Sequence, residues 1–138
     1  MTRLTGRALA PGSVTAAATV LSEPLSLWGG LDPATGELID PHHPQRGRSL
    51  AGRVVVMPGG RGSSSSSSVL AEAVRAGHAP AGFVLAEPDL ILAVGAAVAE
   101  ELYGASLPIV VLEPADFARI LDGARLEIRG AEVRIGSV

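Results

Sequence analysis

The sequence predicts one α/β domain, residues 1–138, built on a parallel sheet with crossover helices and an additional β layer. In the second half of the chain, short apolar runs alternate three times with helical patterns, which is the order of a βαβ fold. In the first third, small and β-branched residues are separated by turn signals, and no helical period appears. A chain of 138 residues is long enough to bury a core as a single domain.

Three apolar runs predict the strands of the parallel sheet, at residues 53–57, 82–85 and 108–112. Each run is four or five residues long, which is typical of a buried strand. Because helical patterns separate the runs, we expect right-handed crossovers and parallel pairing.

Three helical patterns follow these strands. The first is expected at residues 69–76, capped by Ser67 or Ser68 and ended by glycine, and the third at residues 115–121, after a proline. The second, residues 90–103, has Asp89 as its cap and a glycine at its end. Its first ten residues are apolar almost all round, so we expect this helix to be deeply buried or packed against a partner, with burial favoured.

The remaining β-structure is predicted from shorter patterns. Residues 15–21 predict a strand, residues 25–28 an extended segment, and residues 37–40 a short strand or edge. Residues 126–128 and 133–135 alternate about a Gly-Ala pair and predict a hairpin.

Composition excludes several classes of function. With no cysteine, this chain can hold neither a disulfide nor a thiolate metal site nor a cysteine-bound iron–sulfur cluster. A net charge of −3 with no basic block argues against a nucleic-acid partner. The longest apolar stretch is too short for a membrane span and no signal peptide is recognised, so we expect a cytoplasmic protein without membrane contact.

Two isolated features invite a functional interpretation. His42 and His43 are adjacent, but neighbouring side chains on an extended chain point apart and no third ligand accompanies them, so a surface loop is favoured over a metal site. Trp28, the single tryptophan, is most simply a core or interface anchor. The two glycines that follow it leave a role in lining a site open.

The most distinctive stretch joins the strand at 53–57 to the first helix. Its residues 59–65, which we call the serine loop, contain three glycines, Arg61 and the first three of six consecutive serines. A Gly-rich turn that leads into a helix is a natural anion site, because the first N–H groups of the helix lack internal partners. The loop has no P-loop lysine, and Ser65 stands where a dinucleotide fingerprint needs glycine. A flexible linker is less favoured, because linkers rarely begin within a β-run.

Several segments resemble the small subunit of aconitase X. They are Leu-Ser-Leu-Trp-Gly-Gly-Leu-Asp-Pro at 25–33, Ile-Asp-Pro-His-His-Pro at 39–44, and Pro-Gly-Gly-Arg-Gly-Ser-Ser-Ser at 58–65, with further matches at 87–89 and 100–104. The resemblance covers nearly the whole chain and implies a swivelling β/β/α domain. It also implies a large aconitase X-type catalytic subunit as partner, on which an iron–sulfur cluster or iron is expected, with no cofactor or metal held by this chain.

The resemblance further implies a hydro-lyase that is inactive without its large subunit. Members of the family remove water from cis-3-hydroxy-L-proline or from mevalonate 5-phosphate. An arginine-only, alanine-rich composition typical of GC-rich bacteria favours the first substrate. Two alternatives stay open: a non-catalytic module that binds anions or metabolites, and a swivel domain that docks onto other partners.

By position in the resemblance, Ser63 is the catalytic base. Arg61 and Gly62 would bind substrate and stabilise the alkoxide together with the helix N–H groups, and Ser64 and Ser65 would hold substrate or neighbouring amides. Ser66 stands where the family has glycine, and a positive φ there would strain a serine by about 1 kcal/mol or more.

Overall fold

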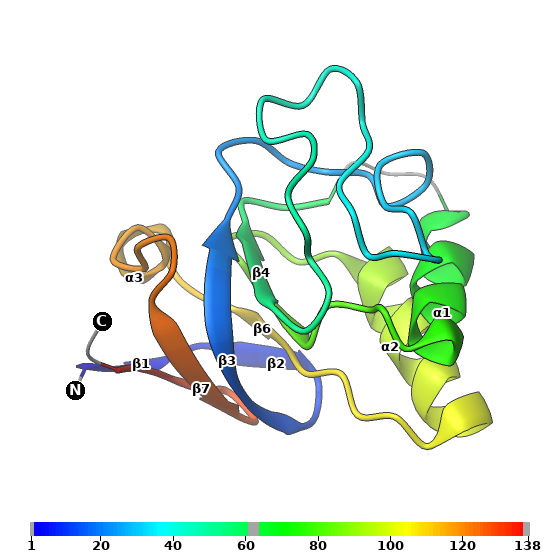
Figure 1. The fold of residues 1–138 in the computed structure, drawn as a ribbon. Helices are drawn as coiled ribbons and strands as arrows, with labels where there is room; N and C mark the ends of the chain where they lie inside the picture. Colours follow the sequence, from blue (N-terminus) through cyan, green and yellow to red (C-terminus); the bar gives the residue numbers. More distant parts are fainter. Residues whose placement is uncertain (1, 61–63, 137–138) are drawn as a thin grey trace.

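The computed structural model describes residues 2–60 and 64–136, which form a three-layered α/β fold (Figure 1). The strands are β1 (Thr2–Thr5), β2 (Arg7–Ala10), β3 (Ser13–Val20), β4 (Val54–Met57), β5 (Gly82–Leu85), β6 (Ile109–Val111), β7 (Arg125–Arg129) and β8 (Glu132–Ile135). The helices are α1 (Ser66–Ala76), α2 (Leu90–Tyr103) and α3 (Pro114–Phe117). Within this described part, no helix is both long and apolar enough to cross a bilayer.

The strands form one sheet in the order β1-β8-β7-β3-β4-β5-β6-β2. Strands β3, β4, β5 and β6 are parallel, which confirms the predicted sheet with crossover helices. The first part of β3 pairs with β7 and its last three residues pair with β4, so this long strand belongs to both β layers. Strands β1 and β2 lie at opposite ends of the order although Gly6 alone separates them in the chain. Gly6 is required there, since a Cβ would lie 2.1 Å from the carbonyl oxygen of Val111.

Two cores separate the three layers. Alternate residues of β4 enter different cores: Val54 and Val56 pack between the β layers, whereas Val55 and Met57 pack beneath α1 and α2. Figure 1 shows α1 and α2 on one side of the parallel strands, with β1, β7 and α3 on the other side. The layers therefore follow the β/β/α order that the resemblance implied.

Helix α2 was predicted with its correct bounds. The Asp89 carboxylate accepts hydrogen bonds from the N–H groups of Ile91 and Leu92, at 3.0 and 3.1 Å, and Gly104 ends the helix with a φ of 66°. Strong local signals at both ends therefore fixed the helix.

Helix α1 begins three residues before the predicted start, at Ser66 rather than residue 69, and still ends at Gly77. The predicted capping by Ser67 or Ser68 is wrong, because the N-cap is Ser65, whose backbone is helical and whose side chain makes no capping bond. Contacts of Ser66 with a distant segment, described below, set this helix start.

Other predictions from short patterns were only partly right. The hairpin at 126–135 forms as β7 and β8, but α3 spans only Pro114–Phe117 instead of 115–121. Past α3 the chain continues in turns, and Ile120 and Ala124 enter the core between the β layers. The segments at 25–28 and 37–40 form isolated β-bridges rather than strands, and strands β1 and β2 were not predicted.

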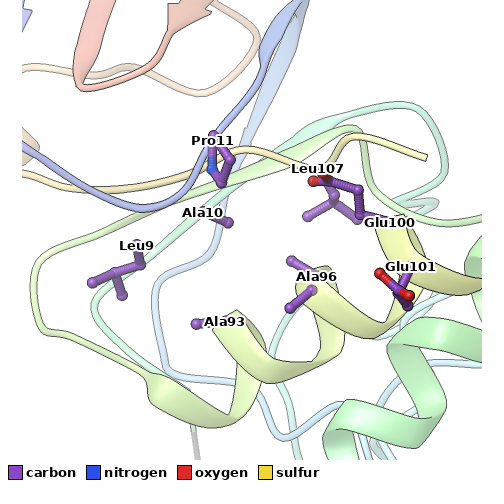
Figure 2. A pocket seen from close by; sticks show the side chains of 9 residues that line it. Leu9, Ala10, Pro11, Ala93, Ala96, Glu100, Glu101 and Leu107 are labelled. Carbon is purple, nitrogen blue, oxygen red and sulfur yellow. The ribbon is translucent and has the colours of Figure 1, made fainter. Parts of the chain in front are cut away.

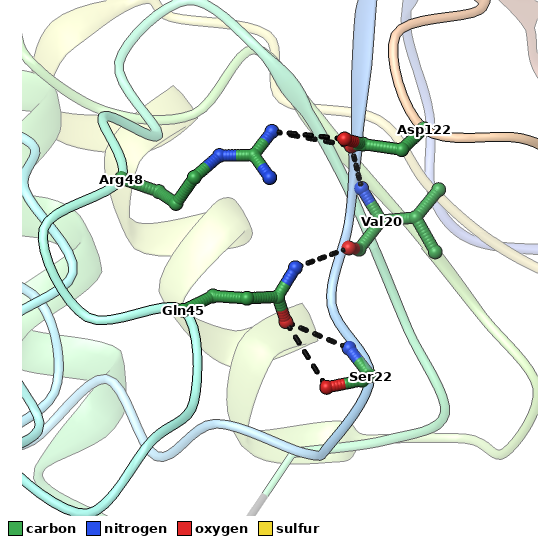
Figure 3. A network of polar contacts seen from close by, with 5 residues as sticks. All are labelled: Val20, Ser22, Gln45, Arg48 and Asp122. Carbon is green, nitrogen blue, oxygen red and sulfur yellow. Dashed lines mark hydrogen bonds and ion pairs between the residues drawn. The ribbon is translucent and has the colours of Figure 1, made fainter.

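A polar network fixes the long connection between β3 and β4 (Figure 3). Asp122 accepts a hydrogen bond from the N–H of Val20 at 2.9 Å and pairs with the Arg48 guanidinium at 3.2 Å. The Gln45 amide donates to the carbonyl of Val20 at 2.7 Å and accepts from the N–H of Ser22 at 2.8 Å. Side chains of the connection thus hold the end of β3 in place.

Replacing Asp122 with alanine should lower the free energy of unfolding by about 0.5–1 kcal/mol at pH 7, a modest value because the carboxylate is half exposed. The hydrogen bond from Val20 and, less strongly, the Arg48 guanidinium lower the pKa of Asp122. The carboxylate therefore stabilises the fold above the ordinary aspartate pKa of about 4, and this contribution is lost as the pH falls below that value. Denaturant unfolding between pH 3 and 7 should show the difference shrink on acidification. Glu101→Ala, at an exposed carboxylate, is the control, and a pH-independent difference would contradict the assignment.

Candidate functional site

The serine loop lies where β4 ends and α1 begins, at the carboxyl end of the parallel strands. The loop that follows β5 lies beside it. The N–H groups of Ala86 and Glu87 both donate to the carbonyl of Pro58, at 3.1 and 3.0 Å, and Gly60 faces the Asp89 carboxylate. Neighbouring strands thus bring two loops together at the edge where ligands of open α/β sheets bind.

The predicted site residues fall into two groups. Arg61, Gly62 and Ser63 lie outside the described residues, so their roles stay predictions. Ser64 and Ser65 are exposed and open α1: the Ser64 carbonyl accepts a hydrogen bond from the Ser67 hydroxyl at 2.9 Å, and the Ser65 carbonyl accepts from the N–H of Val69 at 3.1 Å. The backbone next to Ser63 is therefore held by the first turn of a helix.

Ser66 has a structural role that sequence reasoning missed. Its side chain is buried, and its hydroxyl oxygen accepts a hydrogen bond from the N–H of Trp28 at 3.2 Å and lies 3.4 Å from the Ser26 hydroxyl oxygen. No residue other than glycine has a positive φ in the described ranges, so the strain expected at Ser66 does not arise. Nothing in a run of six serines marks this one as buried.

Trp28 lies beside the site but outside the core. Its side chain is 61% exposed, which corrects the core interpretation and leaves the interface and site-lining interpretations open. Gly30 allows the tight turn behind it, because a Cβ there would lie 2.1 Å from the carbonyl oxygen of Ser26. An exposed tryptophan held against the first turn of α1 is available to a partner or a ligand.

A hollow of about 210 Å³ lies next to the serine loop. Two serines line it from the start of α1 and three apolar side chains from the start of α2: Ser64, Ser67, Leu90, Ile91 and Val94. The hollow is largely apolar, and Ser64 and Ser67 are the lining residues among those described that carry polar side chains.

A larger hollow, of about 340 Å³, lies between the end of β2 and α2 (Figure 2). Its lining is mostly aliphatic, and the only polar side chains in it are those of Glu100 and Glu101. Carboxylates in an aliphatic setting repel an anionic hydroxy acid, so the serine loop is the better candidate site.

The part of the chain that the structure describes offers no cluster of metal-ligating side chains. The chain has no cysteine, and across residues 2–60 and 64–136 no three histidine or carboxylate side chains gather. Both ring nitrogens of His43 are engaged, one 3.1 Å from the carbonyl of Glu23 and the other accepting from the N–H of Gln45 at 3.1 Å. His43 is buried within its loop and only His42 is exposed, so the surface-loop interpretation holds for the latter alone.

Two adjacent glycines allow a matched test of the contact between the loops. A Cβ at Gly60 would lie 1.9 Å from Oδ2 of Asp89, whereas a Cβ at Gly59 would meet nothing closer than 3.6 Å. Gly60→Ala should displace the carboxylate that caps α2, lowering the free energy of unfolding by about 1 kcal/mol, while Gly59→Ala should have little effect. Thermal unfolding of both variants checks this, and equal stability of the two would show that the loops are not in contact.

Comparison with known proteins identifies relatives of this chain. The sequence model described as the aconitase X swivel domain matches residues 3–136. The chain is 51% identical over 129 residues to cis-3-hydroxy-L-proline dehydratase of Pseudomonas aeruginosa, covering 88% of this chain but 22% of that protein. It is 42% identical over 118 residues to the phosphomevalonate dehydratase small subunit of Methanopyrus kandleri, covering 83% of this chain and 87% of that subunit.

The fold agrees with a solved structure of the same kind. A chain of the holo-form of Thermococcus kodakaraensis aconitase X superposes with a TM-score of 0.87 at 29% identity, covering 99% of this chain and 100% of that one. The domain therefore occurs both as a chain of its own and as about a fifth of a longer relative.

Proposed function

Because this chain belongs to the aconitase X swivel-domain family, we propose that it is the swivel component of a hydro-lyase that removes water from a small hydroxy acid. The observation that carries the proposal is the 51% identity to a cis-3-hydroxy-L-proline dehydratase over 88% of this chain. The preferred substrate is accordingly cis-3-hydroxy-L-proline, and the chain acts as a small subunit that needs a large catalytic partner.

The proposed chemistry assigns one step to this chain. The Ser63 alkoxide takes the proton from the carbon that bears the carboxylate, the electron pair forms a double bond to the neighbouring carbon, and the hydroxyl group there leaves as water after protonation. A free serine hydroxyl is too weakly acidic for this step, so its alkoxide needs stabilisation from Arg61 and from the N–H groups at the start of α1.

The other residues of the serine loop would bind and orient the substrate. Gly62 would allow close approach of the backbone, and Ser64 and Ser65, which are exposed, would bind the substrate carboxylate. The leaving hydroxyl group requires a Lewis acid, which we assign to iron or an iron–sulfur cluster on the large partner. This chain has no cysteine, and its described residues gather no three metal-ligating side chains.

Mevalonate 5-phosphate is the second candidate substrate. Its support is the 42% identity to a phosphomevalonate dehydratase small subunit, over 87% of that subunit. The N-terminus of α1 suits a phosphate as well as a carboxylate, so the described geometry does not separate the two anions.

Assays of the assembled enzyme test the proposal. The chain combined with an aconitase X-type large subunit from the same genome should dehydrate cis-3-hydroxy-L-proline, and neither subunit alone should do so. If the assembled enzyme dehydrates mevalonate 5-phosphate but not cis-3-hydroxy-L-proline, the proposed substrate becomes mevalonate 5-phosphate. An assembled enzyme inactive on both, with tight calorimetric binding of carboxylates by this chain alone, would indicate a non-catalytic metabolite-binding module.

A further inference from the structure

Helix α2 exposes an apolar stripe although its sequence favours burial. One face packs into the fold through Leu92, Gly95, Ala96 and Ala99. On the opposite face every fourth residue is a large apolar side chain in contact with solvent: Leu90 is 71% exposed, Val94 54%, Val98 37% and Leu102 63%. Such a row is uncommon on a monomer and is typical of an interaction surface.

The two ends of this stripe lie in different surroundings. Leu90 and Val94 share the hollow beside the serine loop with Ser64 and Ser67, so they form the rim of the candidate site. Leu102 lies three turns further along the helix, about 18 Å from Leu90. The apolar surface is therefore continuous with the candidate site at one end only.

We propose that Leu90 and Val94, which we call the rim pair, are the docking surface for the large catalytic partner, either a separate subunit or the remaining part of a longer chain. This rests on the proposed function, because that chemistry must be shielded from water while the hollow at the serine loop is open on this chain. The existence of such a partner is indicated by the Pseudomonas relative, of which this domain is 22%. A complementary apolar surface of the partner would cover the rim pair and close the site in one step.

The proposed partner and a second copy of the chain predict different contacts on α2. Two copies packed through α2 about a twofold axis would bury the stripe along its whole length, with Leu102 of one copy near Leu90 of the other. The proposed partner closes the site through the rim pair and does not require the far end of α2. Leu102 therefore provides a control variant of similar exposure on the same helix.

Binding affinity tests the proposal directly. Leu90→Ser/Val94→Ser should raise the Kd for the large subunit at least about tenfold in calorimetry, whereas Leu102→Ser should change it less than about twofold. Circular dichroism and thermal unfolding should show both variants folded, since all three side chains are exposed. The proposal would be overturned if the double variant had an unchanged Kd, or if Leu102→Ser weakened binding of the large subunit equally. It would also be overturned if the wild-type chain did not bind the large subunit. A dimer of the isolated chain that the double variant dissociates would overturn it as well.

Failure of this inference can be told apart from failure of the proposed function. If the wild-type complex dehydrates its substrate but the double variant binds normally, only the docking surface is wrong. If the double variant binds more weakly but the wild-type complex removes water from neither candidate substrate, the docking surface stands and the proposed activity is wrong.

Discussion

Replacing Ser63 with alanine should leave assembly with the large subunit intact and lower kcat by about 10²- to 10⁴-fold, which is the usual contribution of a positioned base. The expectation follows from the proposed step, because alanine has no oxygen to take the carbon-bound proton. KM should change little, since Arg61 and the N–H groups of α1 would still bind the substrate anion. Steady-state kinetics on the reconstituted enzyme measure both constants.

Ser68→Ala is the matched control for this experiment. Ser68 belongs to the same serine run and is exposed in the first turn of α1, and alanine suits a helix better than serine. Its kcat should be close to that of the wild type. Undiminished turnover by Ser63→Ala, or an equal loss in both variants, would remove Ser63 as the base.

Replacing Gly95 with valine should destabilise the chain by about 1–3 kcal/mol and lower activity by up to about 100-fold. Gly95 is where α2 meets α1: a Cβ there would lie 3.1 Å from Cδ2 of Leu70 and 3.2 Å from both Cα and the carbonyl oxygen of Ser67. A valine would therefore push Ser67 away, and with it Ser64, whose carbonyl accepts the Ser67 hydroxyl. Thermal unfolding and kcat of the assembled enzyme measure the two effects.

Ala97→Val provides the comparison on the same helix. Residue 97 is exposed, so the added methyl groups meet solvent, and the expected cost is only the lower helix propensity of valine relative to alanine, about 0.5 kcal/mol. Stability and activity should stay near wild-type values. A Gly95→Val variant as stable and active as Ala97→Val would show that close packing of α1 on α2 does not position the serine loop.

The sequence predicted the fold best where local signals agree. Asp89 and Gly104 mark both ends of α2, and the apolar runs of β4, β5 and β6 give the parallel core. It predicted least where distant contacts decide, as at Ser66, whose burial depends on a hydrogen bond from a residue 38 positions away. Strand β1 was missed because its pairing with β8, at the other end of the chain, rather than its own pattern, makes it a strand.

In the candidate site, too, local signals predicted some features and distant contacts decide the others. The position of the serine loop between β4 and α1 follows from sequence pattern alone, since a strand, a glycine-rich turn and a helix follow one another. The approach of Asp89 to Gly60 and the hollow shared by Ser64 and Leu90 depend on packing of α1 against α2, which no local pattern encodes. Trp28 is likewise exposed because the chain makes a tight turn that requires Gly30. Amino-acid composition does not predict this turn.

The most direct measurement is a crystal structure of the assembled wild-type enzyme with L-proline, which lacks the leaving hydroxyl group of the preferred substrate. A base acting from this chain requires the Ser63 hydroxyl oxygen to lie within about 3.5 Å of the carbon that bears the carboxylate. We predict that contact, with the carboxylate facing the start of α1. A side chain of the large subunit in that place, with Ser63 more than about 6 Å away, would contradict the assignment of the base to the serine loop.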